Sequence, residues 1–480
     1  MPAARTTSLK PAGAPPENGA RTGKLAAIVA SRIVDDVFAR EWPVGEVIGS
    51  EAELLARYGV SRAVFREAVR LVEHQHVARM RRGPGGGLVV TEPDVNAVID
   101  AAVMYLLRVR ARLDEVFEAR IIIEEIVTEL AAKRVDENGL ARIRALIDDE
   151  ARGSAIDHRA LHTLLAQTTR NPVLELFVDM LNRVAAFYFS DRQALGSDTL
   201  SAAAQAHKRI AEAVLAGDDG LAKHRMRTHL TAEAEYIRGG RGARQILKPS
   251  DALRGPAGSK RAEAVARDIF GAIVTGRFEP GDFLGSEADL LEEHGVSRAV
   301  LREAVRILEY HHVAAMRRGP GGGLFVVSPS VAPVADGAAV YLKRRGVQVA
   351  HFGEVRVGVE LALGDLVIDG RNAGVEATLR ASLAAEENAT DAQMVEMVHD
   401  LHASIASLSG NRALELIGRV LIRLTRLQEA ERPQRARAQI RAEIHRAHSG
   451  IADALVAGDR ELAHHRMRRH LNAVASSLQQ

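Results

Sequence analysis

Residues 50–87 read SEAELLARYGVSRAVFREAVRLVEHQHVARMRRGPGGG, and residues 286–323 read SEADLLEEHGVSRAVLREAVRILEYHHVAAMRRGPGGG. The two stretches are nearly the same and lie in opposite halves of a 480-residue chain. Their spacing is too long for a solenoid repeat and fits the duplication of a complete small protein. We therefore interpret the chain as an in-line duplication, in which one polypeptide carries both halves of what would otherwise be a homodimer.

Each copy predicts a helix, a glycine turn and a second, basic helix. In the first copy Ser50 is followed by Glu53 at the spacing of a capping box. Gly59 suits the left-handed residue that ends a helix, and Ser61 is a suitable N-cap for the next one. That next helix has apolar residues on one side and arginines at four-residue steps on the other. This order is the one found in helix-turn-helix DNA-binding units.

After the basic helix, two short extended runs flank a glycine-rich connection, residues 83–87 and 319–323, which predicts a β-hairpin wing. Arginine binds guanine O6 and N7 bidentately and also holds phosphates, so these segments predict contacts with DNA. An arginine stripe can also be a solvated helix face. Here the stripe follows Gly-Val-Ser, precedes a hairpin and occurs twice. The predicted DNA-contacting arginines are Arg62, Arg66, Arg70, Arg81, Arg82, Arg298, Arg302, Arg306, Arg317 and Arg318.

The remaining sequence predicts helical bundles. Aromatic residues make up 4% of the chain and hydrophobic residues 47%, a balance that favours helices packed through aliphatic side chains. We expect a mainly α protein, with two winged helix-turn-helix domains alternating with two all-helical bundles. The expected segments are a disordered tail at 1–22, a winged module at 23–93, a bundle at 94–238, a linker at 239–259, a second winged module at 260–329 and a second bundle at 330–480.

Composition limits the other properties of the chain. No apolar run is long enough to span a bilayer, and the N-terminus has no signal-peptide core, so we expect a cytoplasmic protein. The absence of cysteine leaves His, Asp and Glu as the residues that could bind a metal. The net charge of +2 is too small to indicate nucleic-acid binding by itself.

Three histidines recur in each predicted bundle. In both bundles they come from three separate helices, and neutral imidazole is a natural ligand for zinc, nickel or a similar divalent ion. These histidines could equally be hydrogen-bonded residues of the bundle interior. The candidate ligands are His162, His207 and His229 in the first bundle, and His402, His448 and His470 in the second.

The run GVSRAVFREAVRLVE with RRGPGGG resembles the winged helix-turn-helix of the GntR superfamily of bacterial transcriptional regulators, and GVSRAVLREAVRILE does so again. The family usually has an arginine after the Ser-Glu that opens the second helix, whereas this chain has Ala52 and Ala288 there. By this resemblance, family DNA-contact positions fall on Ser61, Arg62, Arg66, Gly83, Ser297, Arg298, Arg302 and Gly319.

The helical regions resemble the FCD ligand-binding domain of the FadR subfamily, which implies a helical sensor for small organic acids or acyl compounds. The resemblance places an Asp ligand four residues before the first histidine of each bundle. His158 stands there in the first bundle, one helical turn from His162, so both could bind a metal. Val398 stands there in the second, where three histidines with water or an effector carboxylate would have to suffice.

Arg120 and Arg356 match an arginine of the first FCD bundle helix. Each could pair with an effector carboxylate, or with the glutamate four residues further along the same helix. This alternative stays open on the sequence alone.

We therefore expect a transcriptional regulator and not an enzyme, acting as a repressor under the control of a small effector, with metal assistance. It would bind a pseudo-palindromic operator as an intramolecular pseudo-dimer, and chains could pair further. One alternative is a DNA-architectural protein without an effector. The other is a three-histidine metalloenzyme, although no acidic residue stands in a catalytic spacing such as HExxH.

Overall fold

The structure, a computed structural model, describes residues 17–75, 77–81, 83, 85–152, 159–186, 197–239, 260–276, 278–317, 319, 321–370, 373–388, 399–430 and 434–479. The chain divides into two compact units, Met1–Pro93 and Asp94–Gln480. In the part that is described, no helix has both the length and the apolar character needed to cross a membrane.

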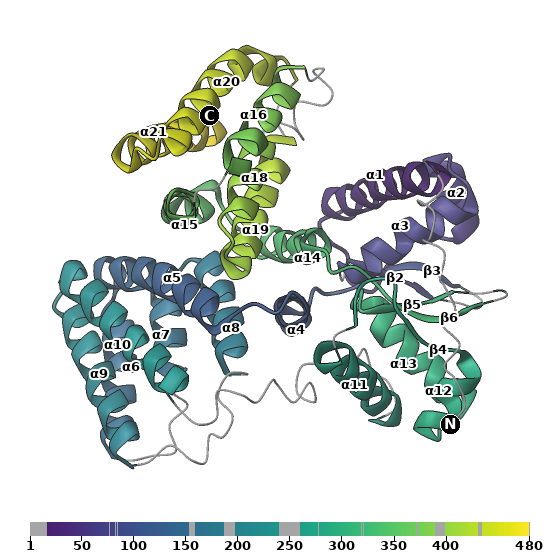
Figure 1. Cartoon of the computed structure of the whole chain (residues 1–480), viewed down its shortest axis with the longest axis horizontal. Coiled ribbons are helices and arrows are strands. Elements are labelled where there is room, and N and C mark those ends of the chain that lie inside the picture. The colour runs from purple at the N-terminus through teal and green to yellow at the C-terminus, as the bar shows by residue number, and fades with distance from the viewer. Residues whose placement is uncertain are drawn as a thin grey trace, which may run out of the picture. The chain divides into compact units, whose positions relative to one another are not determined.

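The first unit is a winged helix-turn-helix module (Figure 1). Ser50 caps α2 with a complete capping box, and Gly59 ends this helix in the left-handed conformation, as the sequence predicts. Ile33 of the first helix and Phe65 of the third are fully buried, and these two helices pack together. The elements are α1 (Glu17–Ala39), β1 (Val47–Gly49), α2 (Glu51–Tyr58), α3 (Arg62–His74), β2 (Ala78–Arg81) and β3 (Gly87–Val90).

The second winged module begins the part of the chain after the predicted linker, whose residues 240–259 lie outside the described ranges. It repeats the first module element by element, including the capping box at Ser286 and the left-handed Gly295. Its elements are α11 (Lys260–Thr275), β4 (Phe283–Gly285), α12 (Glu287–His294), α13 (Arg298–Tyr310), β5 (Ala314–Arg317) and β6 (Gly323–Val326).

Each wing is part of a three-stranded antiparallel sheet, with strand order β1-β3-β2 in the first module and β4-β6-β5 in the second. The sequence pattern predicts only the hairpin, because β1 and β4 are three residues long and too short to show alternation. A Cβ on Gly87 would lie 2.5 Å from the carbonyl oxygen of Gly49. Glycine is therefore needed at position 87, where β3 pairs with the short strand β1.

The first helical bundle follows the first winged module in sequence. Val98, Ile123, Leu165 and Phe177 are buried and form part of its core. Its helices are α4 (Val95–Arg108), α5 (Leu113–Arg134), α6 (Glu137–Ala151), α7 (Ala160–Thr168), α8 (Pro172–Ala186), α9 (Ser197–Leu215) and α10 (Asp219–Gly239).

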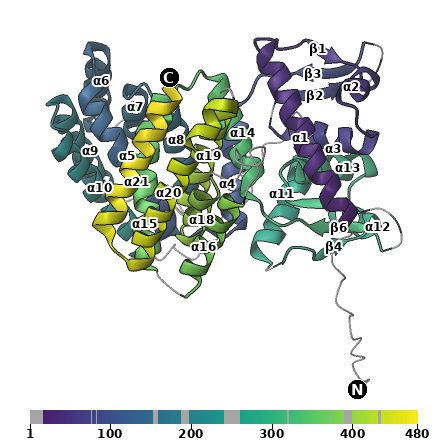
Figure 2. The same cartoon turned by 90° about the horizontal axis from the view of Figure 1, so that it is seen from above.

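The second bundle has a matching set of helices (Figure 2). Corresponding pairs are α4 with α14, α5 with α15, and so on to α10 with α21. The helices are α14 (Val331–Arg344), α15 (Val349–Asp369), α16 (Ala373–Glu387), α18 (Asp400–Leu408), α19 (Arg412–Ala430), α20 (Gln434–Ala457) and α21 (Arg460–Gln479).

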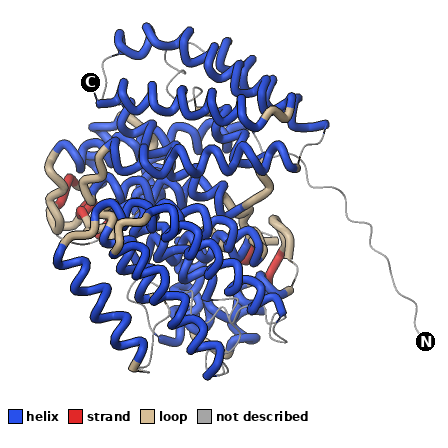
Figure 3. Tube along the Cα trace, turned by 90° about the vertical axis from the view of Figure 1, so that its left-hand side faces the viewer, coloured by secondary structure: helices blue, strands red, loops and turns tan. Residues whose placement is uncertain are grey.

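Helices dominate the described chain, and strands occur only as the short segments of the two winged modules (Figure 3). The predicted fold class, mainly α with two winged modules and two bundles, is confirmed. One boundary differs from the expectation: α1 begins at Glu17, inside the segment predicted as a tail. Residues 17–22 show no apolar spacing, and the pattern that predicts the helix starts only at Ala26.

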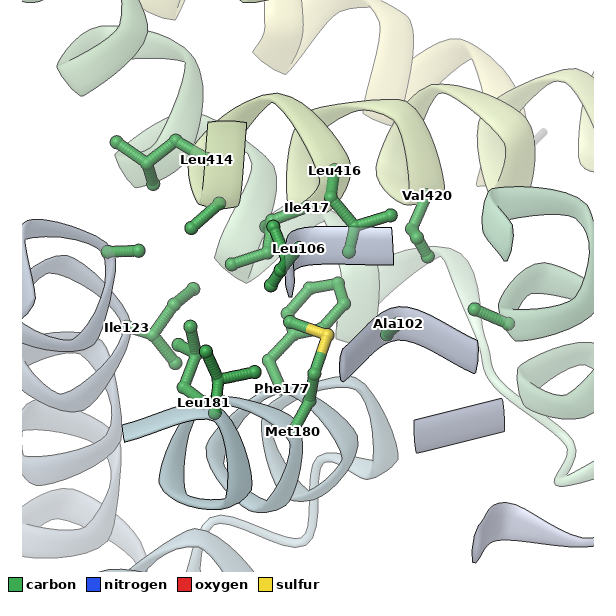
Figure 4. Close-up of a cluster of buried hydrophobic side chains, with 14 of the residues drawn as sticks. Ala102, Leu106, Ile123, Phe177, Met180, Leu181, Leu414, Leu416, Ile417 and Val420 are labelled. Carbon is green, nitrogen blue, oxygen red and sulfur yellow. The ribbon is translucent and has the colours of Figure 1, made fainter. Parts of the chain in front are cut away.

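The two bundles share one hydrophobic core. Phe177 and Met180 of α8 meet Ile417 of α19, and Leu106 of α4 lies between them (Figure 4). The bundles also contact each other through equivalent elements, since α4 packs on α14 and α5 on α15. The cross-pairs α5 with α19 and α15 with α8 are likewise in contact. Contacts of an element with its own equivalent are those of a two-fold interface.

Candidate DNA interface and histidine centres

The arginines of α3 lie on the solvent side of the helix. Arg62 Nε is 3.4 Å and Arg66 Nε 3.2 Å from Glu51 Oε1, and the two arginine side chains are 67% and 65% exposed. Arg70 is also exposed and donates to Glu67 Oε2 at 3.1 Å. Exposed ion pairs of this kind contribute about 0–1 kcal/mol. The arginines can therefore leave these glutamates and bind a phosphate or a guanine with little loss of free energy.

The second copy presents the same side chains from α13. Arg298 and Arg302 are 77% and 74% exposed, and both Nε atoms lie near Glu287 Oε1, at 3.9 and 4.0 Å. Arg306 is also exposed. The predicted arginines of both basic helices are thus brought to one exposed face within each module.

Serine caps start both basic helices. Ser61 Oγ accepts the backbone N–H of Val64 at 3.4 Å, and Ser297 Oγ accepts that of Val300 at 3.4 Å. A hydroxyl that accepts in this way keeps its own O–H as a donor. The two serines can therefore cap the helix and still donate to a phosphate.

The first wing holds Arg81 at its base. This exposed side chain donates from Nη2 to the carbonyl oxygen of Gly85 at 2.9 Å, so it also stiffens the loop. Gly83 is exposed with a φ of 101°, a conformation that favours glycine. Arg82, which the sequence predicts as a DNA contact, lies outside the described residues.

The second wing differs in detail. Arg317 places its guanidinium carbon 4.2 Å from the ring centre of Phe325, a cation–π contact. Gly319 repeats the left-handed conformation, with a φ of 103°. Arg318 lies outside the described residues, as Arg82 does.

The structure brings the three histidines of the first bundle together. His162 comes from α7, His207 from α9 and His229 from α10, and one ring nitrogen of each lies within 4.8 Å of the others. His162 and His207 are buried, and the ring centres are 4.8 to 5.4 Å apart. His158 lies outside the described residues, so its predicted place beside His162 stays a prediction.

The second bundle forms the same cluster from α18, α20 and α21. His402 Nε2 and His448 Nε2 each lie 3.2 Å from His470 Nε2, and all three rings are buried. Val398 lies outside the described residues. His399 is buried nearby, but its Nε2 pairs with Glu429 Oε2 at 2.9 Å.

Buried glutamates hold the opposite nitrogen of these rings. His207 Nδ1 donates to Glu150 Oε1 at 2.9 Å, and His448 Nδ1 donates to Glu386 Oε2 at 2.8 Å. In each case the carboxylate fixes the tautomer, so that the Nε2 lone pair faces the centre of the cluster. Neither glutamate is predicted from the sequence, because both lie far from their histidines in the chain.

A second pair of glutamates lies under the first histidine of each cluster. Glu124 pairs with His162 Nδ1, and Glu360 Oε2 accepts from His402 Nδ1 at 2.6 Å. Burial alone would raise the pKa of Glu360, but His402 and Arg356 lower it to about 2. Burial lowers the pKa of His402 to about 4. The glutamate is therefore ionised and the imidazole neutral at neutral pH, as metal binding requires.

Arg120 and Arg356 lie beside these glutamates, each nearly inaccessible to solvent. Arg120 Nε donates to Glu124 Oε1 at 3.0 Å, and Arg356 Nε donates to Glu360 Oε1 at 2.8 Å. Both arginines thus form the glutamate pair that the sequence left as an alternative to effector binding. Their further partners differ between the two bundles, as described below.

Two asparagines connect the bundles reciprocally. Asn171 Nδ2 donates to the His351 carbonyl oxygen at 2.7 Å and to Glu354 at 3.0 Å. Asn411 Nδ2 makes the equivalent bonds to the Glu115 carbonyl oxygen at 3.0 Å and to Glu118 at 2.8 Å. The interface is therefore two-fold at the level of single hydrogen bonds.

The first bundle also contacts the second winged module. Arg108 of α4 donates from Nη1 to the carbonyl oxygen of His312 at 2.5 Å, and from Nη2 to that of Val327. His312 follows the basic helix α13, and Val327 follows the last wing strand β6. A shift of α4 would therefore act on this module directly.

Exposed basic helices with glycine-tipped wings, joined to helical bundles with internal histidine clusters, define a class of DNA-binding transcriptional regulators. The sequence model of the FCD domain matches residues 115–232 and 352–473, together half of the chain. The model of the bacterial regulatory proteins of the gntR family matches residues 261–326. The chain belongs to the FCD-domain regulators of the gntR family, which are regulatory proteins and not enzymes.

Individual relatives are regulators of about half this length. The HTH-type transcriptional regulator YcbG of Bacillus subtilis is 29% identical over 43% of this chain and 87% of its own length. The Exu regulon transcriptional regulator of Escherichia coli K12 is 26% identical over 43% of this chain and 80% of its own. A solved structure titled Streptococcus agalactiae GntR covers 44% of this chain and 99% of its own, at 21% identity and a TM-score of 0.32.

Proposed function

We propose that a single chain binds a pseudo-palindromic operator as an intramolecular pseudo-dimer and represses transcription until a small organic acid binds in the helical domains. The observation that carries this proposal is the reciprocal pair of asparagine contacts, Asn171 to Glu354 and Asn411 to Glu118. Two-fold contacts between non-identical halves are the contacts that a homodimer of half-length regulators would make.

The two basic helices would read the two half-sites. Arg62 and Arg298 would contact guanine edges, and the arginines one and two turns further along would hold phosphates or bases. The side chains in the two modules are the same, so the half-sites should be nearly identical. The serine caps and wing glycines would contact the backbone of the duplex.

The histidine clusters suit a divalent metal. Metal–nitrogen bonds of about 2.0–2.1 Å place two imidazole nitrogens of a tetrahedral zinc site about 3.3 Å apart. The Nε2 atoms of His402 and His448 lie 3.2 Å from that of His470, which fits this spacing. The three histidines of each bundle would hold the ion, with Glu150 and Glu386 orienting one ring each. When bound, the ion would supply a positive centre for an anionic effector.

Ligand binding would act on DNA affinity through the arrangement of the bundles. A ligand shifts this equilibrium only by the difference between its affinities for the two arrangements. The bonds from Arg108 to the backbone of the second winged module give one connection by which a bundle movement reaches a basic helix. Half-site spacing on DNA is fixed, so a small displacement of either module loses contacts.

The operator can be obtained by selecting duplexes from a random pool with the purified chain. Titration of the selected operator, with light scattering on the complex, should then give one chain per operator. Two chains per operator would refute the pseudo-dimer. An operator with one half-site scrambled serves as the control and should bind far more weakly.

Metal content is measured separately, by elemental analysis of protein purified without added chelator. About one divalent ion per histidine cluster is expected, and His448→Ala should remove the ion from the second cluster only. A metal-free chain with unchanged operator affinity and no response to any organic acid would favour the architectural alternative.

A further inference from the structure

A cavity of about 310 Å³ lies in the second bundle between α15 and α21, two helices that pack along each other (Figure 2). Its walls are mostly apolar and include Phe352, Leu471 and Leu478. Two charged residues also belong to the lining, the buried Arg356 and Glu354, whose carboxylate pairs with Arg134. Exposed residues such as Ala350 belong to the lining, so the cavity is open to solvent.

Two positions of the equivalent region carry larger side chains in the first bundle, whereas at the position of Phe352 the first bundle has the smaller Val116. When α5 and α15 are aligned on Arg120 and Arg356, Phe117 takes the position of Gly353. Phe117 is buried, and the centre of its ring lies 5.0 Å from the guanidinium carbon of Arg120. A Cβ added to Gly353 would meet no described atom within 4 Å. At this position the first bundle therefore has a buried ring, where the second has no side chain.

The second difference lies on the facing helix. When α10 and α21 are aligned on His229 and His470, Glu233 takes the position of Val474. Val474 lines the cavity. Glu233 Oε2 accepts a hydrogen bond from Arg120 Nη1 at 3.0 Å. The first bundle therefore carries a carboxylate of its own at the place where the second has a short apolar side chain.

The two arginines consequently have different electrostatic surroundings. Arg120 pairs with two carboxylates, those of Glu124 and Glu233. Within the described ranges, Arg356 pairs with one carboxylate, Glu360, and its Nη1 donates to the neutral hydroxyl of Thr425 at 3.0 Å. A buried arginine with a single carboxylate partner at the wall of an apolar cavity favours a further anionic group.

We propose that only the second bundle takes a ligand, a monocarboxylic acid with an aliphatic tail, and that Glu233 and Phe117 occupy the corresponding site of the first bundle permanently. The carboxylate binds Arg356, and the tail packs on Phe352 and Leu478. The first bundle then has a structural role. This inference rests on the proposed function only for the consequence of binding, because occupancy is measured without DNA.

The test is calorimetric titration of the full chain with butanoate, hexanoate and octanoate, with 1-octanol as the matched control that lacks a carboxylate. We expect one octanoate per chain and an affinity that rises about three- to fourfold per methylene group, the increment for burying one CH₂. The control 1-octanol should bind at least tenfold more weakly. Two octanoates per chain, none, or equal binding of 1-octanol would overturn the proposal.

Variants that exchange residues between the bundles give an independent measurement. Val474→Glu, which places the first bundle's carboxylate opposite Arg356, should abolish octanoate binding. The pair Glu233→Val and Phe117→Gly should raise the stoichiometry from one to two. Circular dichroism establishes that each variant is folded, and Glu233→Val alone is measured if the double variant unfolds.

Octanoate binding by Val474→Glu with the affinity of the unaltered chain would contradict the assignment of the site. The operator titration described above is performed without octanoate. A chain that binds octanoate once but shows no operator preference would refute the regulatory proposal and leave the ligand site intact.

Discussion

Replacing Arg62 and Arg298 by alanine should separate DNA recognition from folding. The two side chains are 67% and 77% exposed, and their carboxylate partners lie 3.4 and 3.9 Å away. Exposed pairs of this kind contribute about 0–1 kcal/mol each, and alanine is the best helix former, so each substitution should change the folding stability by less than about 1 kcal/mol.

The effect on operator binding should be much larger. Each bidentate contact of an arginine with guanine is worth about 1–3 kcal/mol, so two equivalent half-sites predict a loss of about 2–6 kcal/mol. This range corresponds to a decrease in affinity of roughly 30-fold to 20,000-fold. Each single variant should lose about half of the total free energy, because the two residues lie in separate modules.

Fluorescence anisotropy with the selected operator and a random duplex, at several salt concentrations, measures this loss. If the arginines read bases, the preference for the operator falls while the salt dependence changes little. If they only hold phosphates, affinity falls for both duplexes, and the slope of log affinity against log salt decreases by about 0.9 per lost contact. Arg144→Ala, an exposed arginine of α6, is the matched control. Unchanged operator affinity of the double variant would refute the assignment of both helices.

Three further predictions concern the bundles. Glu386→Gln weakens the hydrogen bond that orients His448, so it should lower the metal affinity about 10- to 100-fold, measured in competition with a chromogenic chelator. An unchanged metal affinity would show that this glutamate is not part of the site. Phe177→Ala should cost about 3–5 kcal/mol of unfolding free energy in denaturant titration, because this ring is buried in the core shared by the bundles; a cost below 1 kcal/mol would contradict that packing. Burial lowers the pKa of His399, although Glu429 acts in the opposite direction, so the unfolded chain takes up this proton first as pH falls. The contribution of His399 to stability is therefore complete above about pH 6.5 and is lost progressively below it, and His399→Gln should flatten this part of a pH–stability curve measured in chelator.

The sequence predicts best the features that local spacing determines. Ser50, Gly59 and Ser61 determine where the helices of the first winged module begin and end, and the structure has these caps. Each strand that completes a wing sheet is missed, since three residues cannot show alternation. Convergence of the histidines is predicted because the same three positions recur in two bundles.

The carboxylates around the histidines could not be predicted from the sequence. Glu150 lies 57 residues from His207, and Glu386 lies 62 residues from His448. Such pairs depend on how α6 packs on α9 and α16 on α20, and nothing in the local pattern of either helix marks the glutamate as an interior residue. The one feature of the sequence that marks them is that Glu150 and Glu386 occupy equivalent positions in the two halves.

Duplication within one chain explains how the two helical bundles could diverge while the basic helices did not. In a homodimer every substitution appears twice, whereas here Phe117 and Glu233 could arise without changing Gly353 and Val474. The nearly identical half-sites proposed above would keep the two basic helices alike. Under the proposed function the bundles would have no such constraint, because one ligand alone would shift an equilibrium between two arrangements of the bundles.

A single ligand site has a measurable consequence. A homodimer with two equivalent sites that switches as a unit responds cooperatively, because two binding events shift one equilibrium. With one site per chain, the release of operator DNA as the carboxylate concentration rises should follow a simple hyperbola with a Hill coefficient of one. Opening the first bundle with Glu233→Val and Phe117→Gly should make the same curve steeper. A steep response of the unaltered chain, with one chain per operator, would mean that both bundles bind ligand and that the divergence described here has no regulatory effect.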